Sequence, residues 1–186
     1  MPDRLHFTGT DEADELIARD PLALLIGFVL DQQVTVQKAF AGPLVLRERA
    51  GTLDAAALAA MDLEPIFRER PAIHRFPGSM AGRVQALCEQ VARDYEGHAE
   101  RVWTEAASAD DLRARLGALP GFGEMKVKAV ASVLSKRFGV RTADALVPDM
   151  PTLGDVGSTA ALADYQAGKR AQKAAKRAER AAARAG

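Results

Sequence analysis

Apolar residues recur at three- and four-residue spacing along most of the chain, and no stretch shows a convincing alternation of apolar and polar positions. The first spacing places side chains on one face of an α-helix, whereas strict alternation would indicate a β-strand. Capping residues, glycines and prolines divide the pattern into segments. The sequence therefore predicts an all-α protein, with helices over residues 10–19, 20–30, 35–49, 52–61, 62–69, 79–95, 98–107, 109–117, 124–139 and from 159 to the end.

The predicted helix 20–30 differs from the others because it is apolar nearly all round. Asp20 suits the N-cap position and Pro21 the first helical position. A helix without a polar face is normally buried, so we expect this one at the centre of the domain. It ends at Asp31-Gln-Gln-Val34, and Thr35 can cap the helix that follows.

A tight turn is predicted in the segment Leu119-Pro-Gly-Phe-Gly-Glu-Met-Lys126, between helices 109–117 and 124–139. Glycine permits positive φ and close approach of the backbone to another surface. The first turn of the second helix presents unpaired N–H groups that suit an anion such as phosphate. This arrangement predicts a helix–hairpin–helix motif, which grips a DNA backbone without selecting sequence. The alternative is an ordinary helix–helix turn, since Pro-Gly and Gly-x-Gly are common there.

Composition narrows the class of protein. The 186 residues and an apolar content of 48% are enough for one domain with a core. The single cysteine, Cys88, excludes an internal disulfide, and the three histidines show no metal-ligand spacing, so we expect no side-chain metal site. No apolar run is long enough for a membrane span, and the N-terminus lacks the order of a secretory signal. We therefore expect a cytoplasmic protein, nucleoid-associated if the chain is bacterial.

The net charge is zero, but its distribution is uneven. Residues 169–186 hold seven basic residues and one acidic residue, a net of +6, which leaves 18 basic and 24 acidic residues in the remainder, a net of −6. We divide the chain into a helical domain, 1–158, and a basic Ala/Lys/Arg-rich tail, 159–186. The tail is expected to be a mobile helix with basic residues scattered around it and no apolar stripe to dock it. It is either a DNA-tracking helix or a solvated terminus.

Four segments occur in an order that resembles a known family: Leu30-Asp-Gln-Gln-Val-Thr-Val36, Leu119-Pro-Gly-Phe-Gly123, Arg137-Phe-Gly139 and Asp144-Ala-Leu-Val-Pro-Asp149. Over about residues 20–150 the chain resembles the HhH-GPD superfamily of base-excision DNA glycosylases, either its alkyladenine-type branch or an uncharacterised relative. The resemblance implies a two-lobed helical fold, double-stranded DNA as partner, and hydrolysis of the N-glycosidic bond of a damaged, flipped-out base. One cysteine excludes the four-cysteine iron–sulfur cluster of another branch, so no cofactor is expected.

The resemblance also implies a catalytic carboxylate about ten residues after the hairpin helix. Asp149 lies ten residues after Gly139, and Asp144 is the second choice. A carboxylate there stabilises the oxocarbenium-like charge that develops as the base leaves. Strict matching to the alkyladenine-type branch places Met150 at the catalytic position. The alternative for either aspartate is a turn residue that binds loop N–H groups.

Bifunctional members of the superfamily carry a Schiff-base lysine two residues after the second hairpin glycine, where this chain has Met125. Lys126 lies about 100° further round the helix. We therefore expect a solvated or phosphate-contacting lysine and a monofunctional enzyme without lyase activity.

Gln33 matches the family's wedge position, where a side chain fills the gap left by the flipped base. The alternative is that Gln32 and Gln33 only cap helix ends. The backbone grip on DNA is expected to involve Gly121, Phe122, Gly123, Lys126 and Lys128. In the superfamily the hairpin carbonyls often hold a monovalent cation, which would place one at Gly121 and Gly123.

Two other functions stay open. Met125 and Met150, at the two catalytic positions of the family, favour a DNA-structure-binding protein whose active site has decayed. A helical interaction module, with the basic tail as its nucleic-acid contact, is the other. The sequence predicts neither the damaged base, nor the protein partners, nor the oligomeric state.

Overall fold

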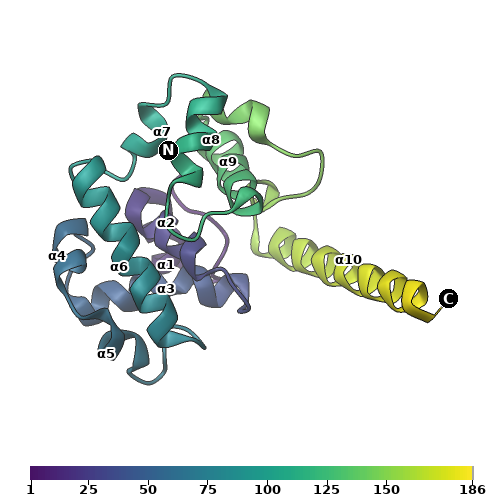
Figure 1. The fold of residues 1–186 in the computed structure, drawn as a ribbon, viewed down its shortest axis with the longest axis horizontal. Helices are drawn as coiled ribbons and strands as arrows, with labels where there is room; N and C mark the ends of the chain where they lie inside the picture. The colour runs from purple at the N-terminus through teal and green to yellow at the C-terminus, as the bar shows by residue number, and fades with distance from the viewer. Residues whose placement is uncertain (186) are drawn as a thin grey trace.

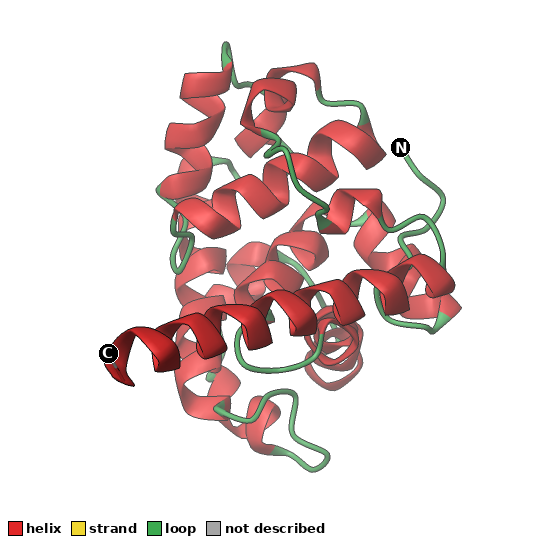
Figure 2. Ribbon diagram, turned by 90° about the vertical axis from the view of Figure 1, so that its right-hand side faces the viewer, coloured by secondary structure: helices red, strands yellow, loops and turns green. Residues whose placement is uncertain are grey.

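The computed structural model describes residues 1–185, and within this range the chain forms ten α-helices and two short 3-10 helices without any strand (Figures 1 and 2). The prediction of an all-α fold is confirmed. The α-helices are α1 (Asp11–Arg19), α2 (Pro21–Leu30), α3 (Val36–Ala50), α4 (Ala55–Ala60), α5 (Leu63–Arg68), α6 (Pro77–Asp94), α7 (Arg101–Thr104), α8 (Ala109–Gly117), α9 (Glu124–Phe138) and α10 (Thr159–Ala185). The 3-10 helices are η1 (Arg141–Leu146) and η2 (Leu153–Asp155).

The helices pack in two groups that share one apolar core. Helices α1 to α6 pack mainly against one another, while α8, η1 and η2 surround or adjoin α9 (Figure 1). A T-shaped aromatic cluster ties the N-terminal segment to the first group: the ring of Phe40 lies 5.0 Å from that of Phe7 and 5.0 Å from that of Phe28, centroid to centroid. Pairs of this geometry add to the free energy of burial itself.

The central helix α2 forms for the reasons that its sequence indicates. The Asp20 carboxylate accepts hydrogen bonds from the backbone N–H of Leu22, at 2.9 Å, and of Ala23, at 3.0 Å. Pro21 occupies the first helical position, and every residue from 22 to 30 is buried. The predicted bounds and burial of this helix are confirmed, and its end carries Asp31 and the two glutamines out of the core.

Two parts of the chain differ from the prediction. The predicted helix 98–107 is reduced to the four residues of α7, because Ser108 and Asp111 start the next helix: the Ser108 hydroxyl accepts from Asp111 N–H, and the Asp111 carboxylate accepts from Ala107 N–H. The predicted loops after Gly139 contain η1 and η2 instead. Each is a short turn held by a buried residue, Ala143 in η1 and Leu153 in η2.

The expectation of an undocked tail is wrong at its start. Leu162, in the first turn of α10, is 2% exposed, and Val156 just before the helix is 1% exposed. The side-chain amides of Gln37 and Gln166 exchange two hydrogen bonds, of 3.3 and 2.7 Å, which join α10 to the start of α3. Beyond this anchor α10 projects away from the other helices (Figure 1).

Gly154 in η2 is a position where a side chain does not fit. A Cβ added there would clash with the carbonyl oxygen of Ser132 and lie 2.8 Å from its carbon, both backbone atoms of α9. We expect Gly154→Ala to lower the free energy of unfolding by about 2 to 3 kcal/mol in urea denaturation, because η2 must move off α9.

Gly82→Ala is the matched control for this substitution. Gly82 lies inside α6 with nothing within 4 Å of an added Cβ, so alanine should stabilise the helix by about 0.5 to 1 kcal/mol. Equal effects of the two substitutions would contradict the assigned role of Gly154.

Candidate nucleic-acid interface

The hairpin between α8 and α9 is a β-turn anchored in the core. Phe122 N–H donates to the carbonyl of Leu119 at 3.1 Å, with Pro120 and Gly121 at the two central positions. Gly121 has φ +81°, the conformation that favours glycine at the third position of a type II turn. Leu119 and Phe122 are 2% and 5% exposed, so they hold the turn from below. Phe122 therefore supports the hairpin from the core, while Gly121 and Gly123 are exposed.

The start of α9 is open to an anion. Gly123 is its N-cap, and no side chain of the described residues caps it. The first N–H groups of a helix have no intrahelical acceptor, and the helix dipole adds partial positive charge there. Only Glu124 brings a negative charge into this first turn, and that carboxylate is paired with Arg113 at 3.0 Å and with Lys128 at 3.6 Å.

Lys126 lies on the inner side of α9 rather than in solvent. Its ammonium is buried and finds no hydrogen-bond partner among residues 1–185, while its nitrogen lies 5.6 Å from the centre of the Phe122 ring. Burial lowers the pKa of Lys126 to about 8; the negative charge of Asp31 opposes this effect and the positive charge of Arg83 adds to it. The structure thus holds a buried, unpaired positive charge in the first turn of α9, and a bound phosphate would stabilise that charge.

Lys126→Met should raise the free energy of unfolding by about 1 to 2 kcal/mol at pH 7, less than the pKa change implies because part of the side chain remains in water. The gain should shrink between pH 8 and pH 10. In this window the folded protein loses the Lys126 proton before the unfolded chain does, so the wild type itself becomes more stable as pH rises.

Urea denaturation of both proteins from pH 7 to pH 10 measures the effect. Lys128→Met serves as control, because the Lys128 side chain is 45% exposed and paired with Glu124. The same pH-dependent gain in Lys128→Met would contradict a special environment for Lys126.

The Gln32–Gln33 turn follows α2, and its two side chains point in different directions. Gln32 points inward: its amide nitrogen donates to the carbonyl of Val29 at 3.1 Å, and its amide oxygen accepts from Arg83 at 2.6 Å. Gln33 is exposed and has φ +56°, a conformation unfavourable for a residue with a side chain. Strained, exposed residues of this kind concentrate at functional sites. Gln33 is therefore the residue free to act on a ligand.

His74 holds the Gln32–Gln33 turn from below, which the sequence does not reveal. Its Nε2 lies 3.1 Å from the carbonyl oxygens of both Leu30 and Gln32, and its Nδ1 accepts from Phe76 N–H at 3.1 Å. With Nδ1 as acceptor, the ring is neutral and its proton is on Nε2. Burial lowers the pKa of His74 below its usual 6.5, which keeps it neutral. The side chain is 1% exposed, and it forms part of the floor of a surface pocket that Arg68, Arg70 and Arg75 also line.

Arg83 on α6 joins the turn to the hairpin. Its guanidinium donates to Gln32, and its Cδ lies 3.9 Å from the position that a Cβ would take on Gly121. Two loops separated by about 90 residues of sequence thus meet around one arginine. Arg75, which is also exposed, donates to the carbonyl of Gln33 at 3.5 Å. The combined surface is locally positive although the body carries an excess of acidic residues.

The two predicted catalytic aspartates have different local surroundings. Asp144 accepts a hydrogen bond from the Ser135 hydroxyl at 2.7 Å, near the end of α9 opposite the hairpin. Asp149 is exposed in a tight turn in which Met150 N–H donates to the Pro148 carbonyl at 2.8 Å. Within residues 1–185 neither carboxylate accepts a hydrogen bond from a loop N–H group, so the alternative is not confirmed either, and their catalytic roles stay predictions.

Asp31 is a carboxylate that the sequence analysis missed. It is the C-cap of α2 and half-buried, and burial raises its pKa above 3.8, while the positive charges of Lys126 and Lys169 oppose this effect. Tyr165 of α10 belongs to the same group, since burial first and the charge of Asp31 second raise its pKa to about 12. Perturbed groups that cluster in this way mark candidate functional sites.

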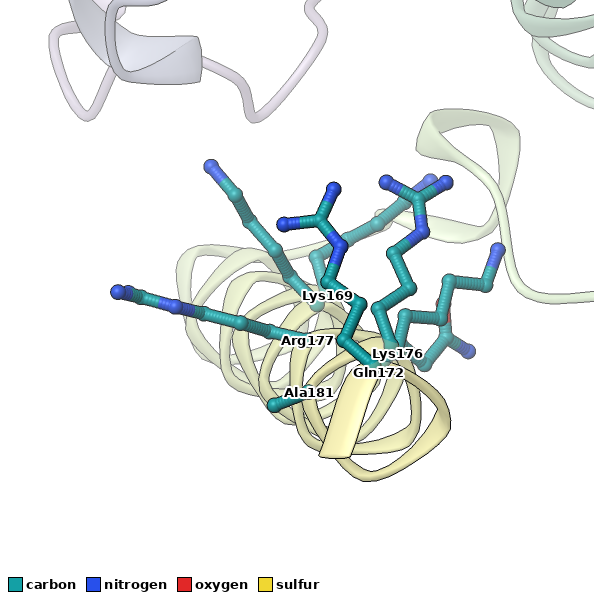
Figure 3. Close-up of a pocket in the computed structure, with 8 residues that line it drawn as sticks. Lys169, Gln172, Lys176, Arg177 and Ala181 are labelled. Atoms are coloured by element: carbon teal, nitrogen blue, oxygen red, sulfur yellow. The ribbon is translucent and has the colours of Figure 1, made fainter. Parts of the chain in front are cut away.

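The basic residues of α10 form one stripe and are not scattered. Counted at about 100° per residue, all seven fall within an arc of about 120°. They are Lys169, Arg170, Lys173, Lys176, Arg177, Arg180 and Arg184. Six of them line a single groove along the helix, and Figure 3 shows the labelled lysines and Arg177 leaving α10 on one side. The expectation of a scattered charge is therefore wrong.

No group of three or more His, Cys, Asp or Glu side chains that could hold a metal occurs within residues 1–185. The monovalent cation expected at Gly121 and Gly123 would bind backbone oxygens and stays a prediction. No helix in the described part of the chain is long and apolar enough to cross a membrane.

No family model matches this chain, and no match is found among curated proteins or solved structures.

Proposed function

We propose that this protein binds double-stranded DNA at the hairpin and the Gln32–Gln33 turn and hydrolyses the N-glycosidic bond of a damaged base, as a monofunctional DNA glycosylase of base-excision repair. The observation that supports this best is the meeting of these two loops around Arg83. The sequence predicts DNA contacts for both loops, and their proximity lets one duplex reach both.

In this proposal the hairpin grips a phosphate of one strand. The exposed Gly121 and Gly123 let the backbone approach closely, and the uncapped start of α9 supplies N–H donors. Lys126, whose buried ammonium has no partner within the described chain, supplies the positive charge behind them. A bound phosphate would raise the pKa of Lys126 back towards its usual value.

Gln33 acts as the wedge in the duplex. Extrusion of a base leaves a gap and an unpaired partner base, and a long amide side chain both fills the gap and offers hydrogen bonds. Gln33 is exposed and its backbone is held by Arg75 and, through the Gln32 carbonyl, by His74. Because the backbone of Gln33 is held in place, its side chain can displace a nucleotide without being pushed aside.

Asp149 is the proposed carboxylate for hydrolysis, and Asp144 the second choice. Hydrolysis without β-elimination follows from Met125, which stands where a lyase lysine would be expected by resemblance and is 73% exposed. The lobes of the resembled fold bind the flipped base between them. The corresponding place here is between the group α1–α6 and the group around α9, where Arg83 of α6 meets the hairpin.

A second candidate function is binding of DNA structures without catalysis. It is favoured by the exposed methionines at both expected catalytic positions, Met125 at 73% and Met150 at 45%. Neither side chain can act as an acid, a base or an electrostatic stabiliser.

The deciding experiment is an excision assay with duplexes that each carry one alkylated, deaminated or oxidised base. Release of any base by the wild type supports the glycosylase. No release from any duplex, together with tighter binding to a duplex bearing an abasic-site analogue than to undamaged duplex, would favour the binding-only function. If Gln33→Ala loses the preference for the abasic-site duplex and the control Gln90→Ala, on the far part of α6, keeps it, the preference belongs to the Gln32–Gln33 turn.

A further inference from the structure

Apart from Lys169, whose charge acts on Asp31, the charged stripe of α10 has no role in the site formed by the hairpin and the Gln32–Gln33 turn. Its seven cations extend from Lys169 to Arg184, fifteen residues or about 22 Å of helix. Ion pairs within residues 1–185 involve none of the seven, so their charges are uncompensated inside the protein.

This arrangement is unfavourable for an isolated helix. Like charges three or four residues apart repel each other, and the stripe contains several such neighbours, including Lys169 with Lys173 and Lys173 with Arg177. A helix with the same composition and its cations spread around the axis would avoid part of this cost. The concentration of charge on one face therefore indicates an anionic partner that is extended along the helix axis.

We propose that the stripe of α10 is a second DNA-binding surface, which lies along the phosphate backbone of a duplex and is separate from the hairpin. Duplex DNA presents about one phosphate per 1.7 Å of axis, so 22 Å of duplex offers about 13 phosphates for seven cations. The partner is the one of the proposed function, but the binding needs neither the hairpin nor catalysis.

The rest of α10 argues against other anionic partners. From residue 169 onward the only apolar side chains are alanines, so the helix has no large residue to insert into an acidic lipid surface. It also has no aromatic or large aliphatic anchor for an acidic protein partner. A surface with charge and without anchors suits a phosphate backbone, where contacts position without selecting sequence.

The anchor of α10 places the stripe next to the hairpin site. The first cation, Lys169, lies with its nitrogen 5.5 Å from the centre of the Tyr165 ring, and its positive charge acts on Asp31, as that of Lys126 does. Gln166, one turn before Lys169, is fixed to Gln37 by two hydrogen bonds. The stripe thus begins at the candidate site and continues away from the body (Figure 1).

A rearranged full-length variant tests this inference without a change of composition or net charge. Three cations move to the opposite face: Lys173→Ala, Arg177→Ala and Arg180→Ala are combined with Ala171→Lys, Ala178→Arg and Ala182→Arg. A second variant neutralises the same three cations as Lys173→Gln, Arg177→Gln and Arg180→Gln. Both keep residues with high helix propensity, which circular dichroism verifies.

The measurement is the affinity for an undamaged duplex of about 20 base pairs as a function of salt, by fluorescence anisotropy. With the stripe in use, both variants lose about 2 to 3 from the slope of log K against log salt, about 0.9 for each lost contact, and at least tenfold in affinity at 0.1 M salt.

Several results would overturn the inference. If the rearranged variant binds duplex as tightly as the wild type, the tail acts only as a generic polycation. The inference also fails if the wild type does not bind undamaged duplex. It fails as well if the wild type binds vesicles with acidic lipid more tightly than duplex at equal phosphate concentration. Lesion excision with unchanged salt slopes would reject the stripe and leave the glycosylase proposal intact. Reduced salt slopes in both variants, with no excision by the wild type, would support the stripe and reject the glycosylase proposal.

Discussion

Replacement of Asp149 by asparagine should lower the single-turnover rate of base excision by about 100- to 1000-fold and leave the affinity for the same duplex unchanged within about threefold. Positive charge develops on the sugar only as the base departs, so a carboxylate stabilises the transition state more than the bound substrate. Asparagine keeps the shape of the side chain and removes its charge. Because Asp149 is exposed in its turn, the free energy of unfolding should change by less than about 0.5 kcal/mol.

Asp144→Asn is the matched control for this prediction. Asp144 contacts Ser135 near the far end of α9, so we expect only the loss of strength in that one hydrogen bond and an unchanged excision rate. Both rates are measured by rapid mixing with enzyme in excess over the duplex that the wild type processes fastest. A rate that falls in Asp144→Asn and persists in Asp149→Asn would transfer the role to the second choice.

Asp31 provides a third arm with a different signature. Burial raises the pKa of Asp31 above 3.8, and the positive charges of Lys126 and Lys169 oppose this effect. If Asp31 were the carboxylate of the reaction, the excision rate would fall in Asp31→Asn. In the wild type the rate would also begin to decline at a higher pH than for a carboxylate with the usual aspartate pKa. Retained excision in Asp31→Asn would limit this residue to its electrostatic effect on Lys126.

The fold follows from the sequence where helices carry their own start and stop signals. Asp20 and Pro21 begin α2 as predicted, and the apolar run after them is buried as predicted. Prediction fails where a helix is decided by its neighbours. Residues 98–107 have helical composition, yet Ser108 and Asp111 capture the backbone for α8 and leave α7 only one turn long.

The candidate site is harder to predict because its residues meet through packing. Arg83 lies on an exposed face of α6 about 50 residues after Gln32 and 40 before the hairpin, and nothing in its local sequence marks it. Lys126 did carry a signal: it precedes the buried Val130 by four residues and Val133 by seven, which places all three on one side of α9. This register places Lys126 on the buried side of α9 and argues against a fully solvated side chain.

The sequence contains the stripe of α10, but only a projection of the charges on a helix, and not their number, brings it out. Basic residues at 169, 173, 176, 180 and 184 follow the four-and-three spacing that defines one helical face. The anchor of the same helix depends on Leu162 and on the Gln37–Gln166 pair, whose partners are 129 residues apart, and local sequence does not contain that information.

His74→Ala should lower the free energy of unfolding by about 3 kcal/mol and the affinity for duplex DNA by about tenfold. The substitution leaves a cavity at a side chain that is 1% exposed and removes the donor that the Leu30 and Gln32 carbonyls share. It also leaves Phe76 N–H without its acceptor. The affinity falls because Gln33 then has to be ordered on binding. His98→Ala, at a side chain that is 55% exposed, is the control and should change stability by less than about 0.5 kcal/mol.

Acid should act on the same contact in the unmodified protein. The folded pKa of His74 lies below its usual 6.5, so the unfolded chain takes up the proton first, and the stabilisation present above about pH 6.5 is lost as pH falls further. Protonation would also turn Nδ1 into a donor facing Phe76 N–H. The stability difference between wild type and His74→Ala, measured in urea at pH 7.5 and 5.5, should therefore narrow at the lower pH. A difference that stays constant would mean that His74 contributes through its volume alone, and the hydrogen bonds to the Gln32–Gln33 turn would then not be what holds the proposed wedge in place.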